Sequence, residues 1–336
     1  YHDPDEAEEW HGSPIRMIKA VQKGYEKSKR QYPLNAKFIF IDSNRQHIEC
    51  LKNYSLPQAG LTEFVNSGSC EFYNDSFENL IDWLILTVGN RKGHSLFLLD
   101  PFGWTQVSMS SIRKINSLPG SEIIYTYMID YIARFIELRH DSQFNNFQNI
   151  LEADGYYLEA DPSGLETFGE QCYLRDQSMK LFRERGNAKY VFTFSLIPRG
   201  NFRVLYYLMH MSGNLTALEV VKESFWKENT LDYEYCFEVY GYGFRSTDYY
   251  QAGQLELQFD INQGSDRFCI SRLDRDVGKL IEDSQDGISF RELSGRTMEK
   301  NPASRKHYTE YLNLRRDARE FEVIRKGEVI TSNKVV

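Results

Sequence analysis

The sequence predicts an α/β protein whose core is a doubly wound sheet. Three observations favour this class. Short apolar segments of strand length alternate with segments in which apolar residues recur at helical spacing. The strand segments are continuously apolar, which is typical of strands covered on both faces. In the second half of the chain, the turn Pro198-Arg199-Gly200-Asn201 joins two strand segments and favours an antiparallel hairpin.

The N-terminal part supplies most of this alternation. Strands are expected at 37–41, 69–73, 95–99 and 122–128, and helices at 13–29, 43–54, 77–88, around 112–115 and at 129–138. Pro14 follows Ser13 at the first helix start, where proline is tolerated because the first turn leaves N–H groups unpaired anyway. Ser43 and Asn44 provide caps for the next helix.

The second half is less regular. Residues 141–188 are polar and mostly helical, which suggests an inserted helical cap. Strands are then expected at 189–197, 202–210 and 255–261, with a helix at 214–226. From residue 287 the order of a short helix, a break at Asn301-Pro302, a second helix and a small hairpin is that of a winged helix-turn-helix. The predicted division is an α/β domain at 1–228, a connecting region at 229–286 and a winged helix at 287–336.

Composition narrows the class of protein. The chain has 336 residues, 40 Lys and Arg against 48 Asp and Glu, and a net charge of −8, which argues against wholesale coating of nucleic acid but not against a local basic patch. No apolar run of about 18 residues is present, so no membrane partner is expected. The five cysteines and seven histidines lack metal-ligand spacing, so we expect no metal and free thiols in a cytoplasmic protein. Phosphate-loop motifs are absent, which disfavours a kinase or ATPase.

Three acidic residues follow predicted strands, at the sheet edge where open α/β folds bind ligands. Asp42 stands where nucleotide-binding folds hold a ribose, since a carboxylate accepts hydrogen bonds from two vicinal hydroxyls. Asn74 and Asp75 follow the next strand, where an adenine amino group is often bound. Helix capping explains Asp42 and Asp75 equally simply.

The most informative segment is Asp100-Pro101-Phe102-Gly103-Trp104, which ends a strongly apolar strand. Proline makes the strand end rigid, and glycine permits a tight turn and close approach of a ligand. An acid beside an aromatic ring suits a planar substrate that bears an amine. The alternative is a strand terminator that only turns the chain.

The predicted winged helix has a modest positive excess. Seven cations and four acids lie between residues 295 and 320. Nucleic acid is therefore one candidate partner, bound through Arg305, Lys306, Arg315 and Arg316. The alternative is a solvated face of a protein-binding winged helix.

Several segments together resemble one family. They are His11-Gly12-Ser13-Pro14-Ile15, Phe38-Ile39-Phe40-Ile41-Asp42, the D-P-F-G motif in Leu98–Trp104, Tyr131–Phe135, and the late strand and helix from Tyr206 to Trp226. This pattern is similar to the three-Cys-motif partner (TcmP) family of S-adenosylmethionine-dependent methyltransferase-like proteins. The D-P-F-G motif is fairly specific in this context, whereas the other segments are weak singly.

The resemblance implies a Rossmann-like class I methyltransferase sheet and S-adenosylmethionine as cofactor. Gly12, Ser13, Asp42, Asn74 and Asp75 would bind the cofactor. The motif Asp100 to Gly103 would stand in place of the D-P-P-Y motif of amino-methyltransferases, although Phe102 replaces the second proline and Gly103 the aromatic residue.

The family's first strand and glycine-rich loop have no counterpart in this sequence. The chain begins with Tyr1, and residues 1–9 carry five acids without an apolar core, so they are not a signal peptide. We expect the missing strand and loop upstream, with the acidic segment leading from them to Gly12.

Three functions stay open from the sequence. The first is methyl transfer to a nucleic acid or a partner protein. The second is a catalytically inactive methyltransferase-fold subunit of a larger bacterial complex, a role that the family name implies and that fits phage defence. The third, a transcription regulator, depends on the winged helix alone.

Overall fold

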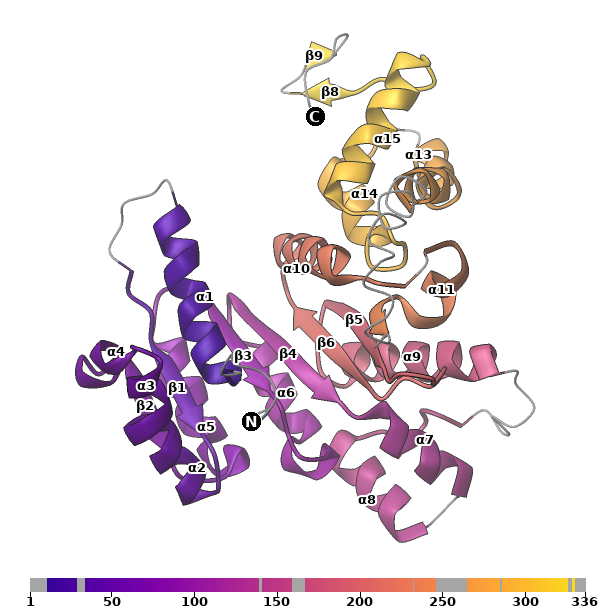
Figure 1. The fold of residues 1–336 in the computed structure, drawn as a ribbon. Coiled ribbons are helices and arrows are strands. Elements are labelled where there is room, and N and C mark those ends of the chain that lie inside the picture. Colours follow the sequence, from indigo (N-terminus) through magenta and orange to yellow (C-terminus); the bar gives the residue numbers. More distant parts are fainter. Residues whose placement is uncertain are drawn as a thin grey trace. The chain divides into compact units, whose positions relative to one another are not determined.

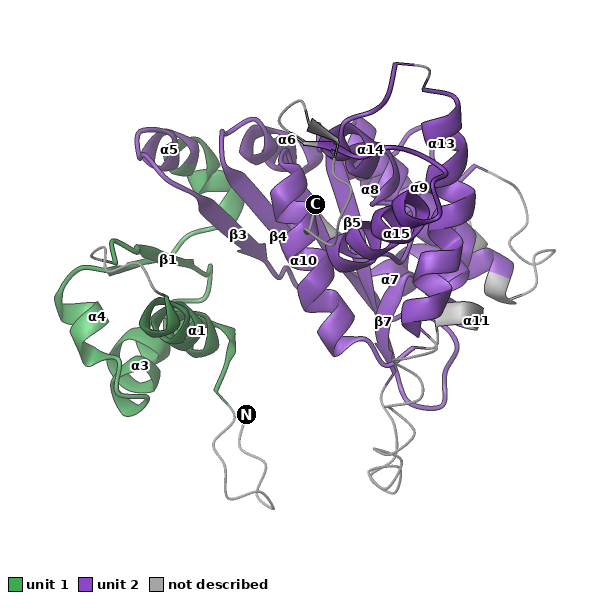
Figure 2. Ribbon diagram, turned by 90° about the horizontal axis from the view of Figure 1, so that it is seen from above, with its two compact units in different colours: residues 1–84 green, residues 85–336 purple. Residues whose placement is uncertain are grey.

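The computed structural model describes residues 11–28, 34–138, 141–158, 167–231, 233–245, 265–284, 286–325 and 328–329. The chain divides into two compact units, residues 1–84 and 85–336 (Figure 2). This division differs from the boundaries near 228 and 286 that the sequence predicts.

The first unit contains a two-stranded parallel sheet with short helices. Its elements are α1 (Ser13–Lys27), β1 (Phe38–Ile41), α2 (Arg45–Cys50), the π-helical turn η1 (Leu51–Ser55), α3 (Leu56–Gln58), α4 (Thr62–Asn66), β2 (Cys70–Tyr73) and the start of α5 (Phe77–Gly89). Ile15 and Ile18 of α1 pack into its core beside Phe40 and Leu56. The predicted cap is confirmed, since the Asn44 side chain accepts a hydrogen bond from the Gln46 N–H at 2.9 Å.

The second unit contains the larger sheet. Its first elements are β3 (Ser95–Leu99), the 3-10 turn η2 (Trp104–Gln106), α6 (Met109–Asn116), β4 (Ser121–Tyr127), α7 (Ile129–Leu138), α8 (Asp141–Leu151), α9 (Thr167–Glu184), β5 (Tyr190–Ile197), β6 (Tyr206–Ser212), α10 (Leu215–Glu228), α11 (Tyr233–Tyr240) and β7 (Tyr242–Arg245). The C-terminal elements are a helix at 265–273, η5 (Asp274–Gly278), α13 (Lys279–Glu282), α14 (Phe290–Thr297), α15 (Arg305–Asp317), β8 (Ile324–Arg325) and β9 (Glu328–Val329).

The five strands of this sheet have the order β3-β4-β6-β5-β7. Figure 1 shows β3, β4, β6 and β5 side by side in this order. β6 runs antiparallel to β4 and to β5. β3 runs parallel to β4, and β7 runs parallel to β5. The predicted hairpin of β5 and β6 is therefore confirmed. We call the edge at which β3, β4, β5 and β7 end and β6 begins the carboxyl edge.

The sequence predicts one sheet, and the structure has separate ones. β1 and β2 form their own parallel ladder because each pairs only with the other among the described strands. β3 also differs from expectation, since it is an edge strand in which Leu96 is 57 % and Leu98 37 % exposed. The predicted strand at 255–261 lies outside the described residues.

Helices cover both faces of the central strands, as the continuous apolar pattern predicts. Phe192 of β5 stacks on Phe225 of α10 on one face. On the other face, Tyr125 and Tyr127 of β4 contact Phe182 of α9. The segment 141–188 is thus not only an inserted cap, because α9 forms part of the cover of the sheet.

The C-terminal helices share the core on the α10 side of the sheet. Tyr190 and Phe192 of β5 belong to the same buried cluster as Leu293 of α14 and Tyr308 of α15. The elements after residue 287 follow the predicted order of helix, turn, helix and hairpin. They do not form a separate unit, because their apolar side chains need the sheet to be buried.

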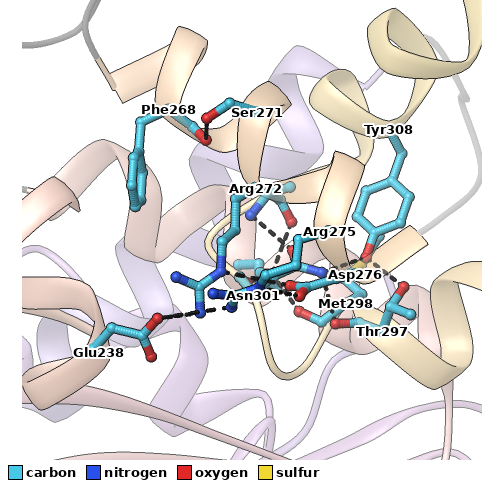
Figure 3. Close-up of polar contacts among 12 residues, drawn as sticks. Glu238, Phe268, Ser271, Arg272, Arg275, Asp276, Thr297, Met298, Asn301 and Tyr308 are labelled. Carbon is cyan, nitrogen blue, oxygen red and sulfur yellow. Dashed lines mark hydrogen bonds and ion pairs between the residues drawn. The ribbon is translucent and has the colours of Figure 1, made fainter. Parts of the chain in front are cut away.

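Polar contacts fix this C-terminal segment in place. The hydroxyl of Tyr308 lies 2.7 Å from Thr297 Oγ1 and accepts a hydrogen bond from Asn301 Nδ2 at 2.8 Å (Figure 3). Within the same close-up, Arg272 pairs with Glu238 of α11. In the described part of the chain, no helix is long and apolar enough to cross a membrane.

Candidate active site

Asp42 lies directly after β1, as predicted, and its carboxylate is 41 % exposed. Oδ1 accepts the Asn44 N–H at 2.7 Å, and Oδ2 lies 3.0 Å from His47 Nδ1. These contacts are those of an ordinary loop before a helix. A carboxylate has about four acceptor positions, so two remain available for hydroxyl groups of a ligand.

Asn74 and Asp75 lie at the same edge of the first unit, because β1 and β2 are parallel. Asn74 Nδ2 donates to the carbonyl oxygens of Asp42 and Ser43, at 3.0 and 2.9 Å. Asn74 therefore ties the two strand ends together. Asp75 Oδ1 accepts hydrogen bonds from the Ser76 N–H and from Asn79 Nδ2.

Gly12 and Ser13 begin α1 in the same unit. The Gly12 carbonyl accepts the Arg16 N–H at 3.2 Å and closes the first turn. A Cβ on Gly12 would meet only Pro14 at an ordinary 3.7 Å. This glycine is therefore not required by crowding at its position.

The Asp100–Gly103 motif lies in the second unit, at the carboxyl edge beyond β3. Asp100 is exposed, Pro101 is buried, and Phe102 is 92 % exposed. The Phe102 N–H donates to Gln106 Oε1 at 2.9 Å, and Gly103 has φ of 148°. A residue with a side chain would be strained there, so the glycine holds the loop in a shape that presents the Phe102 ring to solvent.

Tyr206 is a neighbour of this motif that the sequence analysis missed. It begins β6 at the carboxyl edge, and burial together with the negative charge of Asp100 raises its pKa. The phenol is therefore neutral at pH 7 and available as a hydrogen-bond donor. Its nearness to Asp100 depends on the antiparallel pairing of β6, which no local sequence signal reveals.

A second polar group lies at the carboxyl edge after β4. Asp130 pairs with Arg134 on α7, and the Arg134 guanidinium lies 5.8 Å from the Tyr131 ring centroid. The Asp130 N–H donates to the Leu205 carbonyl just before β6. Tyr131 is 52 % exposed, so a second exposed aromatic ring follows a strand end at this edge.

The predicted nucleic-acid contacts on α15 are all engaged by acids. Arg305 pairs with Glu219 at 2.9 Å and Lys306 with Asp266 at 3.2 Å. Arg315 pairs with Glu320 at 2.8 Å. The Arg316 side chain is only 6 % exposed and pairs with Asp317. Their net field toward solvent is therefore weaker than the sequence suggests.

Lys222 of α10 is a further residue that sequence reasoning missed. It is fully buried, and Nζ donates to the carbonyl oxygens of Met298, Asn301 and Ala303. Burial lowers its pKa to about 7. This residue holds the connection between α14 and α15 against α10. The position of one lysine on an amphipathic helix gives no local signal of such burial.

His307 belongs to a second buried polar contact of α15. Its Nε2 lies 2.7 Å from Asp266 Oδ1, and its Nδ1 accepts the Ser304 N–H at 3.0 Å. Burial lowers the pKa of His307 although Asp266 opposes that shift. Ser304 and His307 form a capping box at the start of α15, so this arrangement is structural.

The acids of each unit differ in their surroundings. Those of the first unit are partly exposed acceptors, a donor set that fits a nucleoside. Those of the carboxyl edge lie beside aromatic rings, which fits a planar amine. In the described part of the chain, no group of three or more His, Cys, Asp or Glu residues could hold a metal ion.

Comparison of the chain with protein-family models, with curated proteins and with solved structures finds no match.

Proposed function

We propose that this protein is an S-adenosylmethionine-dependent methyltransferase whose acceptor is a planar aromatic amine in a nucleic acid. The observation that carries the proposal is the Asp100–Gly103 loop, where an exposed carboxylate and a 92 % exposed phenyl ring follow one strand. A phenylalanine ring that is exposed to solvent does not contribute the free energy that its burial would give to the folded state. A ligand-binding role accounts for that cost.

The carboxyl edge supplies the groups that an amine acceptor needs. Asp100 would accept an N–H of the amine and orient its lone pair. The Tyr206 hydroxyl would donate to a ring nitrogen or carbonyl oxygen, and Phe102 would stack on the ring face. Attack on a methyl sulfonium depends mainly on positioning of a neutral nucleophile.

The first unit would hold the cofactor, which supplies an electrophilic methyl group when bound. Asp42 would accept the two ribose hydroxyls with the acceptor positions that Asn44 and His47 leave open. Asp75 would accept from the adenine amino group. Gly12 and Ser13 would lie toward the methionine part.

The edge of the larger sheet supports the expected additional strand. β3 pairs only with β4 among the described strands, and its sequence Ser-Leu-Phe-Leu-Leu has neither charge nor proline. Natural edge strands normally carry such protection against pairing. An unprotected edge is therefore suited to a further strand, as the methyltransferase sheet requires.

The test is calorimetric titration of the full chain with S-adenosylmethionine, beside Asp42→Ala. We expect micromolar affinity for the wild type and at least a tenfold loss in the variant, because two hydroxyl contacts to a charged acceptor are removed. Asn90→Ala, at an exposed turn of the second unit, is the control and should bind normally. Failure of the wild type to bind would contradict the proposal.

A second candidate is the inactive methyltransferase-fold subunit of a bacterial complex. The carboxylates of Asp42 and Asp75 both make the local contacts of ordinary helix starts, which favours this role. The exposed rings of Phe102 and Tyr131 would then contact a partner protein. The same titration separates the two candidates, since only the enzyme needs the cofactor.

A further inference from the structure

α1 carries a dense row of positive charge on an acidic protein. Residues 11–30 contain six of the chain's 40 Lys and Arg residues but one of its 48 Asp and Glu residues. Four of these cations, Arg16, Lys19, Lys23 and Lys27, belong to α1. The local charge is thus opposite in sign to that of the whole chain.

These four cations lie on one side of the helix. At 3.6 residues per turn they fall within an arc of about 80°. Ile18 projects from roughly the opposite side and is fully buried in the core of the first unit. The cationic row therefore faces away from that core, and Lys23 and Lys27 are exposed.

Two cations of this row, Lys23 and Lys27, are not neutralised by neighbouring acids in the way that other cations of this unit are. Lys37 pairs with Glu71, and Arg45 pairs with Glu49. In contrast, Lys23 and Lys27 make no ion pair within residues 11–28 and 34–84. Lys19 Nζ lies 3.1 Å from His11 Nε2, which is not an acid.

We propose that the exposed face of α1 binds the phosphate backbone of a nucleic acid. From Arg16 to Lys27 the helix rises about 16 Å, a length over which one DNA strand presents about five phosphates. A helix that lies on a membrane needs a broad exposed apolar face. In α1, Ile15 and Ile18 are buried in the protein, and Val21 and Tyr25 are only 37 % and 38 % exposed. The proposal goes beyond methyl transfer, because this surface needs no cofactor.

Fluorescence anisotropy of the full chain with a labelled 20-base-pair duplex of arbitrary sequence tests this surface. Four phosphate contacts predict that the logarithm of the affinity falls with the logarithm of salt concentration with a slope of about −3.6. The double variant Lys23→Gln, Lys27→Gln should reduce that slope by about 2 and weaken binding at least about 20-fold at 50 mM salt. Lys23→Arg, Lys27→Arg should restore both.

Two further double variants make the result specific. Lys227→Gln, Lys279→Gln removes the same charge from exposed positions of α10 and α13 and should change affinity less than about threefold. The double variant Arg305→Gln, Lys306→Gln removes the same charge from α15. The proposal is overturned if the α1 variant loses no more affinity than the control, if the α15 variant loses more, or if the wild type binds anionic phosphatidylserine vesicles but not the duplex. Calorimetry with S-adenosylmethionine is a separate readout, so failure of one proposal leaves the other testable.

Discussion

α1 and α15 are both rich in cations, but their cations are used differently. On α15, Arg305 and Lys306 face Glu219 and Asp266, and Arg316 is nearly buried. On α1, Lys23 and Lys27 are exposed and have no acidic partner among the described residues of their unit. Charge counted along a sequence therefore does not locate a binding surface, because the fold decides which cations are already neutralised.

The buried contacts behind α15 extend this contrast. Lys222 and His307 join α10, the helix at 265–273 and the connection before α15 into one core. Cations of this region should therefore affect stability, whereas those of α1 should affect affinity. The following changes test that separation.

Lys222→Met should give the largest effect. It keeps the length of the side chain but leaves three buried carbonyl oxygens without a donor, and each such loss costs about 1–3 kcal/mol. We expect the free energy of unfolding in urea to fall by at least about 3 kcal/mol. Lys227→Met on the same helix, where the side chain is 65 % exposed, should change it by less than about 0.5 kcal/mol. Equal effects of the two variants would contradict the structural role of Lys222.

Acidification should weaken the same region by a smaller amount. Burial lowers the pKa of His307 in the folded chain, so below about pH 6.5 the unfolded chain takes up a proton that the folded chain resists. The contribution of neutral His307 to the free energy of unfolding is therefore complete above that pH. It is lost as the pH falls, by at most about 1.4 kcal/mol per pH unit. Asp266, Lys306 and Lys222 face this ring, and Asp266 remains ionised because its own pKa is lowered.

Hydrogen exchange of α15 amides between pH 7.5 and 5.5, corrected for the intrinsic rate, measures this effect. Lys222, whose pKa is lowered to about 7, contributes to the upper part of this range. His307→Gln should therefore flatten the pH dependence below about pH 6.5, while the exposed His47→Gln in the first unit should leave it unchanged. If the pH dependence below about pH 6.5 persists in the His307→Gln variant, a titratable group other than His307 causes it.

Arg305→Gln, Lys306→Gln should have a small effect on stability. The two cations are largely exposed, at 61 % and 68 %, although Glu219 is only 10 % exposed. Ion pairs of exposed cations contribute about 0–1 kcal/mol each. Urea unfolding should therefore shift by less than about 2 kcal/mol. A larger loss would mean that these pairs, rather than Lys222, hold α15 in place.

Local patterns predicted the elements well but not their assembly. Asn44 caps the helix that it was expected to cap, because capping depends on neighbours in sequence. Asn214 and Ser289 cap α10 and α14 in the same way. The separate β1–β2 ladder and the shared core of α14 and α15 depend on contacts between distant segments. No periodicity within a segment reports those contacts.

For the candidate site too, the sequence predicted the residues at strand ends but not the contacts between distant segments. Asp42, Asp75 and Asp100 lie at strand ends because an apolar run followed by an acid marks where a strand stops. Tyr206 was missed because only the strand order brings it within the field of the Asp100 charge. The lysines of α1 had a visible signal, six cations in 20 residues, which the net charge of −8 concealed.

The most direct test of the separation measures duplex affinity and unfolding free energy on the same two proteins, Lys23→Gln, Lys27→Gln and Lys222→Met. The account predicts that the α1 variant loses at least about 20-fold in affinity at 50 mM salt with less than about 0.5 kcal/mol of stability. Lys222→Met should lose at least about 3 kcal/mol, yet bind the duplex within about threefold of the wild type under conditions where it remains folded. Loss of affinity in Lys222→Met alone would contradict the account and place the nucleic-acid surface on the C-terminal helices.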